Sequence, residues 1–223
     1  MNSTSDNAIK KMVDFKSDYT RGAHPKVIER LVQTNLYSTP GYGEDEFCAS
    51  ASKLILEECG LPEGAVYFLV GGTQTNRLMV DALISQVQGV ICTPEAHINV
   101  HEAGAIEATG HKVLPIPSTQ GKLSADTLDK YMSNFYADAT WPHMVIPGMV
   151  YISQPTELGT LYSLAELQRL REVCDKWHLK LYVDGARLIY GLASPYNDVS
   201  LRDMGAIFDA FYIGGTKAGL LFG

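Results

Sequence analysis

The chain has 223 residues, enough for one large domain or two small ones. Its composition, 46% hydrophobic and 19% charged, is typical of a globular protein and excludes a mostly disordered chain, a collagen and a coiled coil. With 18 basic against 25 acidic residues the net charge is −7, and without a basic run the chain is a poor binder of nucleic acid.

The N-terminus, MNSTSDNAIKKMVDF, is polar and lacks the apolar segment of a secretory signal peptide. No stretch approaches the ~18 consecutive apolar residues that a membrane-spanning helix needs. The four cysteines are scattered and form no C-x-x-C pair. Together these features predict a cytoplasmic protein with reduced thiols and no membrane partner.

From about residue 65, short apolar runs alternate with helical patterns. The predicted strands are 65–70, 89–92, 111–116, 144–153, 179–183 and 209–213. The predicted helices are 75–87, 98–108, 124–132 and one that opens at Ser163, where Ser163 and Glu166 have the spacing of a capping box. This alternation indicates crossover units and an α/β fold with a mostly parallel sheet flanked by helices.

Residues 1–45 differ from the rest of the chain. They are rich in Gly, Pro and Tyr and show weaker periodicity. We therefore predict an N-terminal arm and loop over 1–45, lying across a large domain over 46–223.

In an open parallel sheet, ligands bind beyond the carboxyl ends of the strands. Four predicted strands are followed there by unusual residues. These are GGTQ at 71–74, PEAH at 94–97, DGAR at 184–187 and GGTK at 214–217.

Gly71, Gly72 and Thr73 lie between a predicted strand and a predicted helix. Glycines let a ligand approach the backbone, and free N–H groups at a helix N-terminus bind anions, so a phosphate site is one interpretation. The segment matches neither G-x-G-x-x-G nor G-x-x-x-x-G-K-[ST]. A plain strand-to-helix turn is the alternative.

Asp184 and Lys217 each follow an apolar strand. The carboxylate of Asp184 could accept from a protonated ring nitrogen or bind a metal, or simply pair with Arg187 three residues later. Lys217 is surrounded by glycines, and a desolvated lysine amine has a lowered pKa and attacks carbonyls. An exposed surface lysine is the alternative.

His97 and His101 are four residues apart and are followed by Glu102. The order H-x-x-x-H-E matches no zinc-enzyme motif, and no third ligand lies at a useful spacing, so we predict no metal site. A zinc hydrolase on these three residues remains a minor hypothesis. His97 could instead lay its ring over a flat ligand, or be an ordinary hydrogen-bonded histidine at a helix start.

Together, these groups supply what pyridoxal 5′-phosphate requires. They offer a phosphate site, a ring partner, an acid for the pyridine nitrogen and a lysine that forms a Schiff base. The bound cofactor then accepts the electrons of a breaking bond at Cα of an amino acid.

The sequence resembles the low-specificity L-threonine aldolases, which are fold-type-I pyridoxal-phosphate enzymes related to beta-eliminating lyases. The resemblance rests on motifs that follow one another along nearly the whole chain. They are the opening segment FKSD (15–18) with GAHP (22–25), YGED (42–45), GTQTN (72–76), AHI (96–98) with EAGA (102–105), SQPTELGT (153–160), DGARL (184–188) and GTK (215–217).

This resemblance implies an aspartate-aminotransferase-like large domain with a seven-stranded type of sheet, and a homodimer or homotetramer. It implies that Lys217 holds the cofactor, that Asp184 binds its pyridine nitrogen, and that Arg187 binds its 3′-oxygen and the substrate carboxylate. Gly72, Thr73 and nearby Gln74 would bind the phosphate. His97 would stack on the ring and is a candidate base, and Ser17 would face the substrate.

The implied reaction cleaves β-hydroxy-α-amino acids, L-threonine or L-allo-threonine, to glycine and an aldehyde. His97, Glu157 or a held water could remove the hydroxyl proton. Tyr19-Thr20-Arg21 departs from the usual Asn-x-x of the family. The family also has a C-terminal small domain of roughly a hundred residues that this chain lacks. An inactive cofactor-binding fragment and a related beta-eliminating lyase are therefore the alternative hypotheses.

Overall fold

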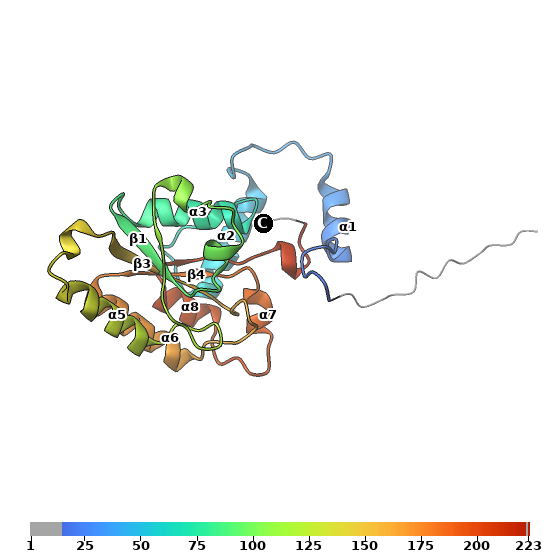
Figure 1. Ribbon diagram of the computed structural model, residues 1–223. Coiled ribbons are helices and arrows are strands. Elements are labelled where there is room, and N and C mark those ends of the chain that lie inside the picture. The colour runs from blue at the N-terminus through green and yellow to red at the C-terminus, as the bar shows by residue number, and fades with distance from the viewer. Residues whose placement is uncertain (1–14, 222) are drawn as a thin grey trace, which may run out of the picture.

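The computed structural model describes residues 15–221 and residue 223. Five parallel strands form one sheet in the spatial order β2-β1-β3-β4-β5. They are β1 (Gln88–Cys92), β2 (Val113–Pro115), β3 (Ile146–Ser153), β4 (Lys180–Asp184) and β5 (Ala210–Phe211). Helices cover both faces of the sheet, which confirms the predicted α/β class (Figure 1).

Helices follow or precede nearly every strand. They are α1 (Pro25–Thr34), α2 (Glu46–Cys59), α3 (Gly72–Leu83), α4 (His97–Val100), α5 (Ala125–Ala137), α6 (Leu164–Trp177), α7 (Leu188–Leu192) and α8 (Leu201–Ile207). Short 3₁₀ turns lie at Glu107–Thr109, Trp141–His143 and Thr216–Ala218.

Two apolar clusters hold the layers together, one on each face of the sheet. One face is covered by α5, α6 and α8 (Figure 1). Side chains of these helices pack against Val150 and Leu181 of the sheet. On the other face, α3 and the segment after β1 pack against Met149 and Tyr182. Because both faces are covered, the strands consist of buried residues, which is why their sequences read as continuous apolar runs.

Helix α6 begins where the sequence predicts. The Ser163 hydroxyl accepts from the backbone N–H of Glu166 at 3.3 Å, and the Glu166 carboxylate accepts from the backbone N–H of Ser163 at 2.8 Å. This reciprocal pair satisfies two backbone donors that the first turn of a helix leaves without partners. The predicted capping box is confirmed.

The strand predicted at 65–70 is wrong. Its residues adopt no regular structure, and Tyr67 and Val70 are 81% and 77% exposed. β-forming residues show only that a segment would fit a half-buried sheet surface, and within the described chain no strand pairs with this run. The sheet of the described residues therefore has five strands instead of the expected seven.

The helix predicted at 98–108 is also wrong in its length. It is divided into α4 and the turn Glu107–Thr109, with an irregular segment between them. Ala103 and Gly104 have φ values of 50° and 73° there, in the left-handed region that ends a right-handed helix. This break brings Glu102 back toward the start of α4, which matters for the site described below.

The N-terminal segment contains more helix than the sequence suggests. Helix α1 lies within the predicted arm, and α2 follows it. None of the residues of α1 is buried, and Figure 1 shows this helix apart from the sheet, joined to α2 by a loop that arches outward. The side-chain hydrogen bonds of α1 are local, and Arg30 lies over the ring of Phe47 in α2. The weak periodicity of 1–45 did not predict this helix.

No helix among the described residues is long and apolar enough to cross a membrane. The leader-free N-terminus predicted from residues 1–15 falls almost entirely outside the described residues. All four cysteines are free thiols, and Cys59, Cys92 and Cys174 are buried.

Candidate active site

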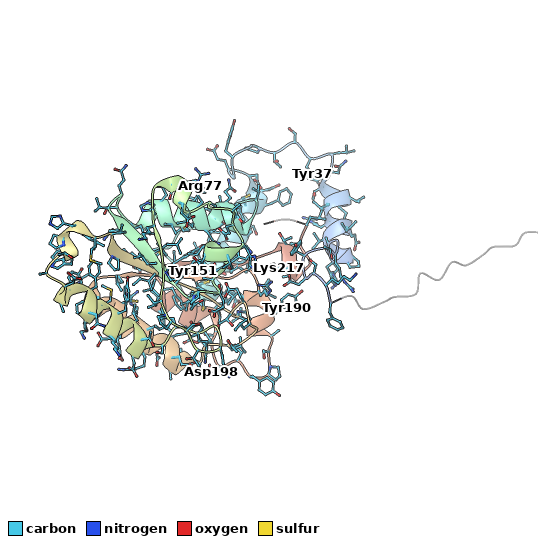
Figure 2. All side chains as sticks on the ribbon, viewed as in Figure 1. Tyr37, Arg77, Tyr151, Tyr190, Asp198 and Lys217 are labelled. Carbon is cyan, nitrogen blue, oxygen red and sulfur yellow. The ribbon has the colours of Figure 1, made fainter. Side chains whose placement is uncertain are left out.

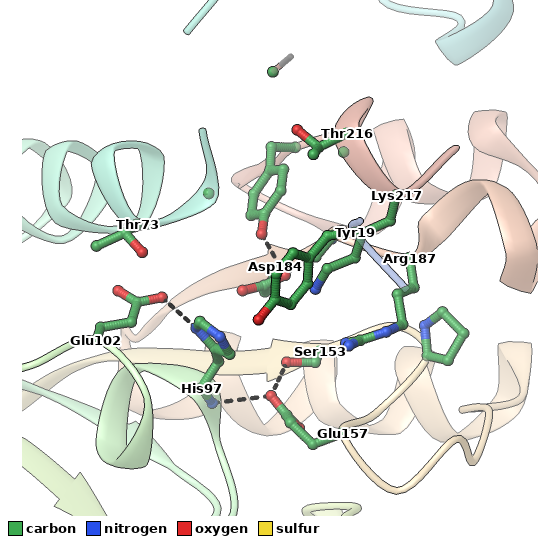
Figure 3. Close-up of a pocket in the computed structure, with 16 residues that line it drawn as sticks. Tyr19, Thr73, His97, Glu102, Ser153, Glu157, Asp184, Arg187, Thr216 and Lys217 are labelled. Atoms are coloured by element: carbon green, nitrogen blue, oxygen red, sulfur yellow. Dashed lines mark hydrogen bonds and ion pairs between the residues drawn. The ribbon is translucent and has the colours of Figure 1, made fainter. Parts of the chain in front are cut away.

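A cavity of about 350 Å³ opens at the carboxyl ends of the strands. The chain passes from β1 to β2 on one side and returns to β3 on the other, so the strand order reverses between β1 and β3. Crevices at such a reversal are where open parallel sheets bind ligands. The side chains gathered there are drawn in Figure 3.

The N-terminus of α3 forms one wall of this cavity. Gly72 and Thr73, its first two residues, both line the cavity. A Cβ at Gly72 would lie 2.8 Å from the hydroxyl of Tyr212, so glycine is what allows that hydroxyl to approach the helix. The N–H groups of a first helical turn have no acceptor within the helix, and this 12-residue helix presents them with its positive dipole end. The wall therefore suits an anion.

Asp184 ends β4 and is 4% exposed. Its carboxylate accepts four hydrogen bonds, from the hydroxyls of Tyr151 (2.5 Å) and Tyr212 (2.6 Å), the backbone N–H of Ala186 (2.9 Å) and the side-chain amide of Asn76 (3.1 Å). Every partner donates, which suits an ionised carboxylate because that group only accepts. Burial and the nearby Asp184 charge raise the pKa of both tyrosines.

His97 lies on the opposite wall, at the start of α4. Its Nδ1 is 2.7 Å from Oε1 of Glu102, whose side chain is fully buried (Figure 3). The hydrogen bond to Glu102 raises the pKa of His97, although burial opposes this shift. The backbone N–H of His97 donates to Glu157 at 3.0 Å, and the Ser153 hydroxyl donates to the same oxygen at 2.6 Å.

Lys217 lies in the turn after β5, at the end of the sheet that faces α1 (Figure 2). Its side chain points into the cavity beside the ring of Tyr19 (Figure 3). Burial lowers the pKa of Lys217, and the positive charge of Arg187 lowers it further. The hydroxyl of Tyr190 donates to the backbone carbonyl of Lys217 and so helps to hold the turn. The lowered pKa leaves a larger fraction of the Lys217 amine neutral, and the neutral amine is the form that attacks carbonyls.

Arg187 also lines the cavity and is held by the N-terminal segment. Its guanidinium donates to both carboxylate oxygens of Asp18, at 2.5 Å from Nε and 3.3 Å from Nη2. Burial alone would raise the pKa of Asp18, but the hydrogen bond and charge of Arg187 lower it. This pair holds Asp18 beside the cavity, which the next residue, Tyr19, also lines.

The structure brings most of the predicted site residues together. Gly72, Thr73, His97, Asp184, Arg187 and Lys217 all line the cavity. Two others do not. The Ser17 hydroxyl accepts from the backbone N–H of Tyr19 at 3.4 Å, and Gln74 accepts from the backbone N–H of Val70 at 3.3 Å, so both are used in local turns outside the lining.

The described residues contain no group of three or more His, Cys, Asp or Glu side chains that could hold a metal ion. His97 already binds Glu102 through Nδ1, and His101 is exposed with its ring centroid 5.6 Å from that of His97. The geometry gives the zinc-hydrolase hypothesis no support.

Sequence reasoning missed the part played by several residues. Tyr19 and Tyr212 line the cavity, and Asn76 lies behind it. Glu102 appeared only as a possible metal ligand beside two histidines and as part of the EAGA motif, with no role toward His97. The signal available for Asn76 was its spacing within the GTQTN motif. It lies one helical turn after Thr73 and therefore on the same side of α3.

Comparison with known proteins gives a consistent picture. The family model described as beta-eliminating lyase matches residues 14–221. A low specificity L-threonine aldolase of Pseudomonas aeruginosa is 30% identical over 215 residues, which are 94% of this chain and 60% of that protein. The low specificity L-threonine aldolase of Saccharomyces cerevisiae is 27% identical over 202 residues, 90% of this chain and 50% of that protein.

A solved structure of threonine aldolase from Leishmania major superposes with a TM-score of 0.88 at 43% identity, covering 92% of this chain and 59% of that chain. The similarity confirms the fold expected from the sequence. The chain thus spans only about half to 60% of the length of the relatives that it matches.

Proposed function

The chain belongs to the beta-eliminating lyase family, and from this premise we propose that it binds pyridoxal 5′-phosphate and cleaves β-hydroxy-α-amino acids to glycine and an aldehyde. L-Threonine and L-allo-threonine are the proposed substrates, since the relatives compared above are threonine aldolases. One observation carries the proposal. A half-buried lysine amine, a buried carboxylate, an imidazole and a helix N-terminus meet in one cavity.

The residues fit this cofactor. Gly72 and Thr73 at the N-terminus of α3 would hold the phosphate, because unpaired N–H groups and the helix dipole both favour an anion. Asp184 would hold the pyridine nitrogen in its protonated form. Its lone pairs are already engaged, and among its three side-chain donors Tyr212 lines the cavity, so a ring N–H would take the place of the Tyr212 hydroxyl.

When bound, pyridoxal phosphate supplies a sink for the electron pair that is released as the Cα–Cβ bond breaks. The protein groups do the rest. Lys217 would hold the cofactor through its amine, and its lowered pKa leaves more of that amine in the neutral form. Arg187 would bind the substrate carboxylate with its two-pronged guanidinium, in place of Asp18. His97 and Glu157, which both line the cavity, or a held water would accept the hydroxyl proton.

The proposal also covers the cellular compartment and the oligomeric state. We place it in the cytoplasm as a homodimer or homotetramer. Four free cysteines support a reducing compartment, and exposed apolar side chains at Leu36, Tyr37 and Tyr67 support contacts with a second copy. We keep 1–45 as an arm and 46–223 as the large domain.

The test is to mix the purified chain with pyridoxal phosphate and record the visible absorption band of a lysine-bound cofactor. Borohydride reduction followed by peptide mapping should locate the adduct on Lys217. Lys217→Ala should abolish the band and the adduct. Lys53→Ala, whose amine is on the surface with a 76% exposed side chain, should change neither. Adduct formation on another lysine, or no band at all, contradicts the proposal.

Turnover separates the remaining alternatives. Release of glycine and aldehyde from L-threonine and L-allo-threonine at a rate of about 1 s⁻¹ or more supports the aldolase. A band without turnover identifies a cofactor-binding fragment. Release of pyruvate or another keto acid from β-substituted amino acids, without glycine, identifies a beta-eliminating lyase.

A further inference from the structure

Asn76 connects two carboxylates beneath the cavity. Its side chain is fully buried, and its amide nitrogen donates to Oε1 of Glu102 at 2.7 Å and to Oδ2 of Asp184 at 3.1 Å. Its amide oxygen accepts from the hydroxyl of Tyr182 at 2.9 Å. The alternative amide orientation would place the amide oxygen against the oxygens of two carboxylates, so the hydrogen-bond partners determine which way the side chain points.

Glu102 lies between Asn76 and the imidazole of His97 and contacts both. Its Oε1 accepts from Asn76 and lies 2.7 Å from Nδ1 of His97, while its Oε2 is buried and has no hydrogen-bond partner among the described residues. Leaving a carboxylate oxygen buried and unpaired costs free energy. Glu102 bears this cost while its other oxygen, Oε1, is held by Asn76 and in turn holds the imidazole of His97.

The contact with Glu102 also determines the state of the imidazole. A carboxylate accepts, so Nδ1 of His97 carries the proton and, in the neutral ring, Nε2 is the acceptor nitrogen. A second partner that selects the tautomer and the orientation of a functional imidazole is a recurring device in enzymes.

We propose that Asn76 and Glu102 are positioning residues, in which Asn76 anchors Glu102 to the Asp184 site and Glu102 holds His97 as the Nδ1–H tautomer with Nε2 free to accept a proton. This inference rests on the proposed function for its meaning in catalysis. It does not require bound cofactor for its test, because each contact exists in the chain alone.

The charges around His97 come from several elements. Glu102 and Asp184 favour the protonated ring, and Lys217 opposes it. Glu157 binds the backbone N–H of His97 rather than its ring. Among these, Glu102 alone forms a hydrogen bond to the ring, so its removal should have the largest effect on the titration of His97.

The experiment uses the full 223-residue chain labelled with ¹⁵N-histidine, without cofactor, and two-bond ¹H–¹⁵N spectra that distinguish the two imidazole tautomers. The His97 signals are assigned by their loss in His97→Gln. We expect the Nδ1–H tautomer in the unmodified chain. Glu102→Gln keeps an acceptor but removes the charge, so it should keep the tautomer and lower the titration midpoint by about one pH unit. Glu102→Leu should shift His97 mainly to the Nε2–H tautomer.

Asn76→Leu removes the anchor, so a second tautomer of His97 should appear beside the first. Glu107→Gln is the matched control, since it removes an exposed carboxylate five residues from Glu102 and should leave the His97 spectrum unchanged. The buried His111, whose Nδ1 lies 2.9 Å from the Gln88 carbonyl, reports whether each variant keeps its fold. If Glu102→Leu loses the His111 signal, Glu102→Gln decides the part assigned to Glu102. If Asn76→Leu loses it, the smaller change Asn76→Ala decides the part assigned to Asn76.

An unchanged His97 midpoint in Glu102→Gln, or an Nε2–H tautomer in the unmodified chain, overturns the inference. An unchanged spectrum in a folded Asn76→Leu overturns the part assigned to Asn76. A chain that binds no pyridoxal phosphate but shows the expected spectra refutes the proposed function and leaves the positioning pair in place.

Discussion

Four donors converge on the carboxylate of Asp184, and the hydroxyl of Tyr151 makes the shortest of these hydrogen bonds at 2.5 Å. Tyr151 lies on the central strand β3, and Tyr212 reaches the same carboxylate from just beyond β5. Asp184, at the end of β4, is therefore held by side chains from the β3 side and from the β5 side. The four donors hold this buried carboxylate in one orientation, and among the described residues no ion pair to it is formed.

We predict that Tyr151→Phe destabilises the protein by about 2 kcal/mol, because it leaves one site of a buried carboxylate without its donor. The difference in free energy of unfolding can be measured with urea. Tyr196→Phe removes a hydroxyl from a residue that is 89% exposed and should change stability by less than about 0.5 kcal/mol. Equal stability of both variants would show that the Tyr151 hydroxyl contributes nothing.

For single residues, the sequence identifies the reactive groups better than the residues that hold them in position. Asp184 ends β4, and His97 and Lys217 lie in the segments that follow β1 and β5, where the fold places ligand-binding residues. Asn76 reaches partners 26 and 108 residues away. Contacts over such separations leave no local pattern, so the bridge from Asn76 to both carboxylates was not predictable.

Among the elements, β4 and β5 are joined by a side chain as well as by their backbones. The carboxylate of Asp209 accepts from the backbone N–H of Leu181 at 2.9 Å, from Arg171 at 2.8 Å and from Lys180 at 3.0 Å. Burial opposes ionisation, but these partners outweigh it and lower the pKa of Asp209. The short strand β5 is thereby fastened to its neighbour.

We predict that Asp209→Asn costs about 2 kcal/mol of stability near neutral pH. Because the pKa of Asp209 is lower in the folded than in the unfolded chain, its stabilisation is present above about pH 3.8 and is lost as pH falls through the folded value. Urea unfolding at a series of pH values should therefore show the difference shrinking below about pH 3.8.

Asp126→Asn is the matched control for Asp209→Asn, since its side chain is 92% exposed and 3.4 Å from Arg169. Exposed pairs of this kind contribute about 0–1 kcal/mol. A pH-independent difference for Asp209→Asn would contradict the role of its charge.

Elements with local signals were predicted well and those without were not. The capping box of α6 and the apolar runs of β3 and β4 are local patterns, and each led to a correct element. The run at 65–70 has the same composition but no strand beside it in the described chain. Whether a β-forming segment becomes a strand depends on a neighbour that its own residues do not specify.

For the whole molecule, the site depends on close approach between the loops that follow β4 and β5. A Cβ at Gly185 would lie 1.7 Å from the backbone carbonyl oxygen of Tyr212, and the Gly185 carbonyl accepts from Gly214 N–H at 2.9 Å. A Cβ at Gly214 would likewise lie 2.7 Å from the backbone of Ala186. These glycines set the distance between the Asp184 and Lys217 segments.

We predict that Gly185→Ala destabilises the protein by more than about 3 kcal/mol, since backbone must move apart to admit one methyl group. Thermal unfolding and the recovery of soluble protein measure this effect. Gly41→Ala is the matched control, because nothing lies within 4 Å of the added methyl group and the φ of Gly41 is outside the left-handed region, so it should be nearly neutral. A stable Gly185→Ala protein would show that the two loops are free to separate.

The sequence by itself determined the alternation of strands and helices, and with it the parallel sheet and the edge at which reactive residues collect. It also determined which residue types stand at that edge, since these lie at the strand ends or in the segments that follow the strands. The tertiary structure alone decided which other side chains form hydrogen bonds to these residues and hold them in position. Asn76, Glu102 and Tyr212 act through distances between segments far apart in the chain, and such distances exist only once the sheet and its covering helices have packed.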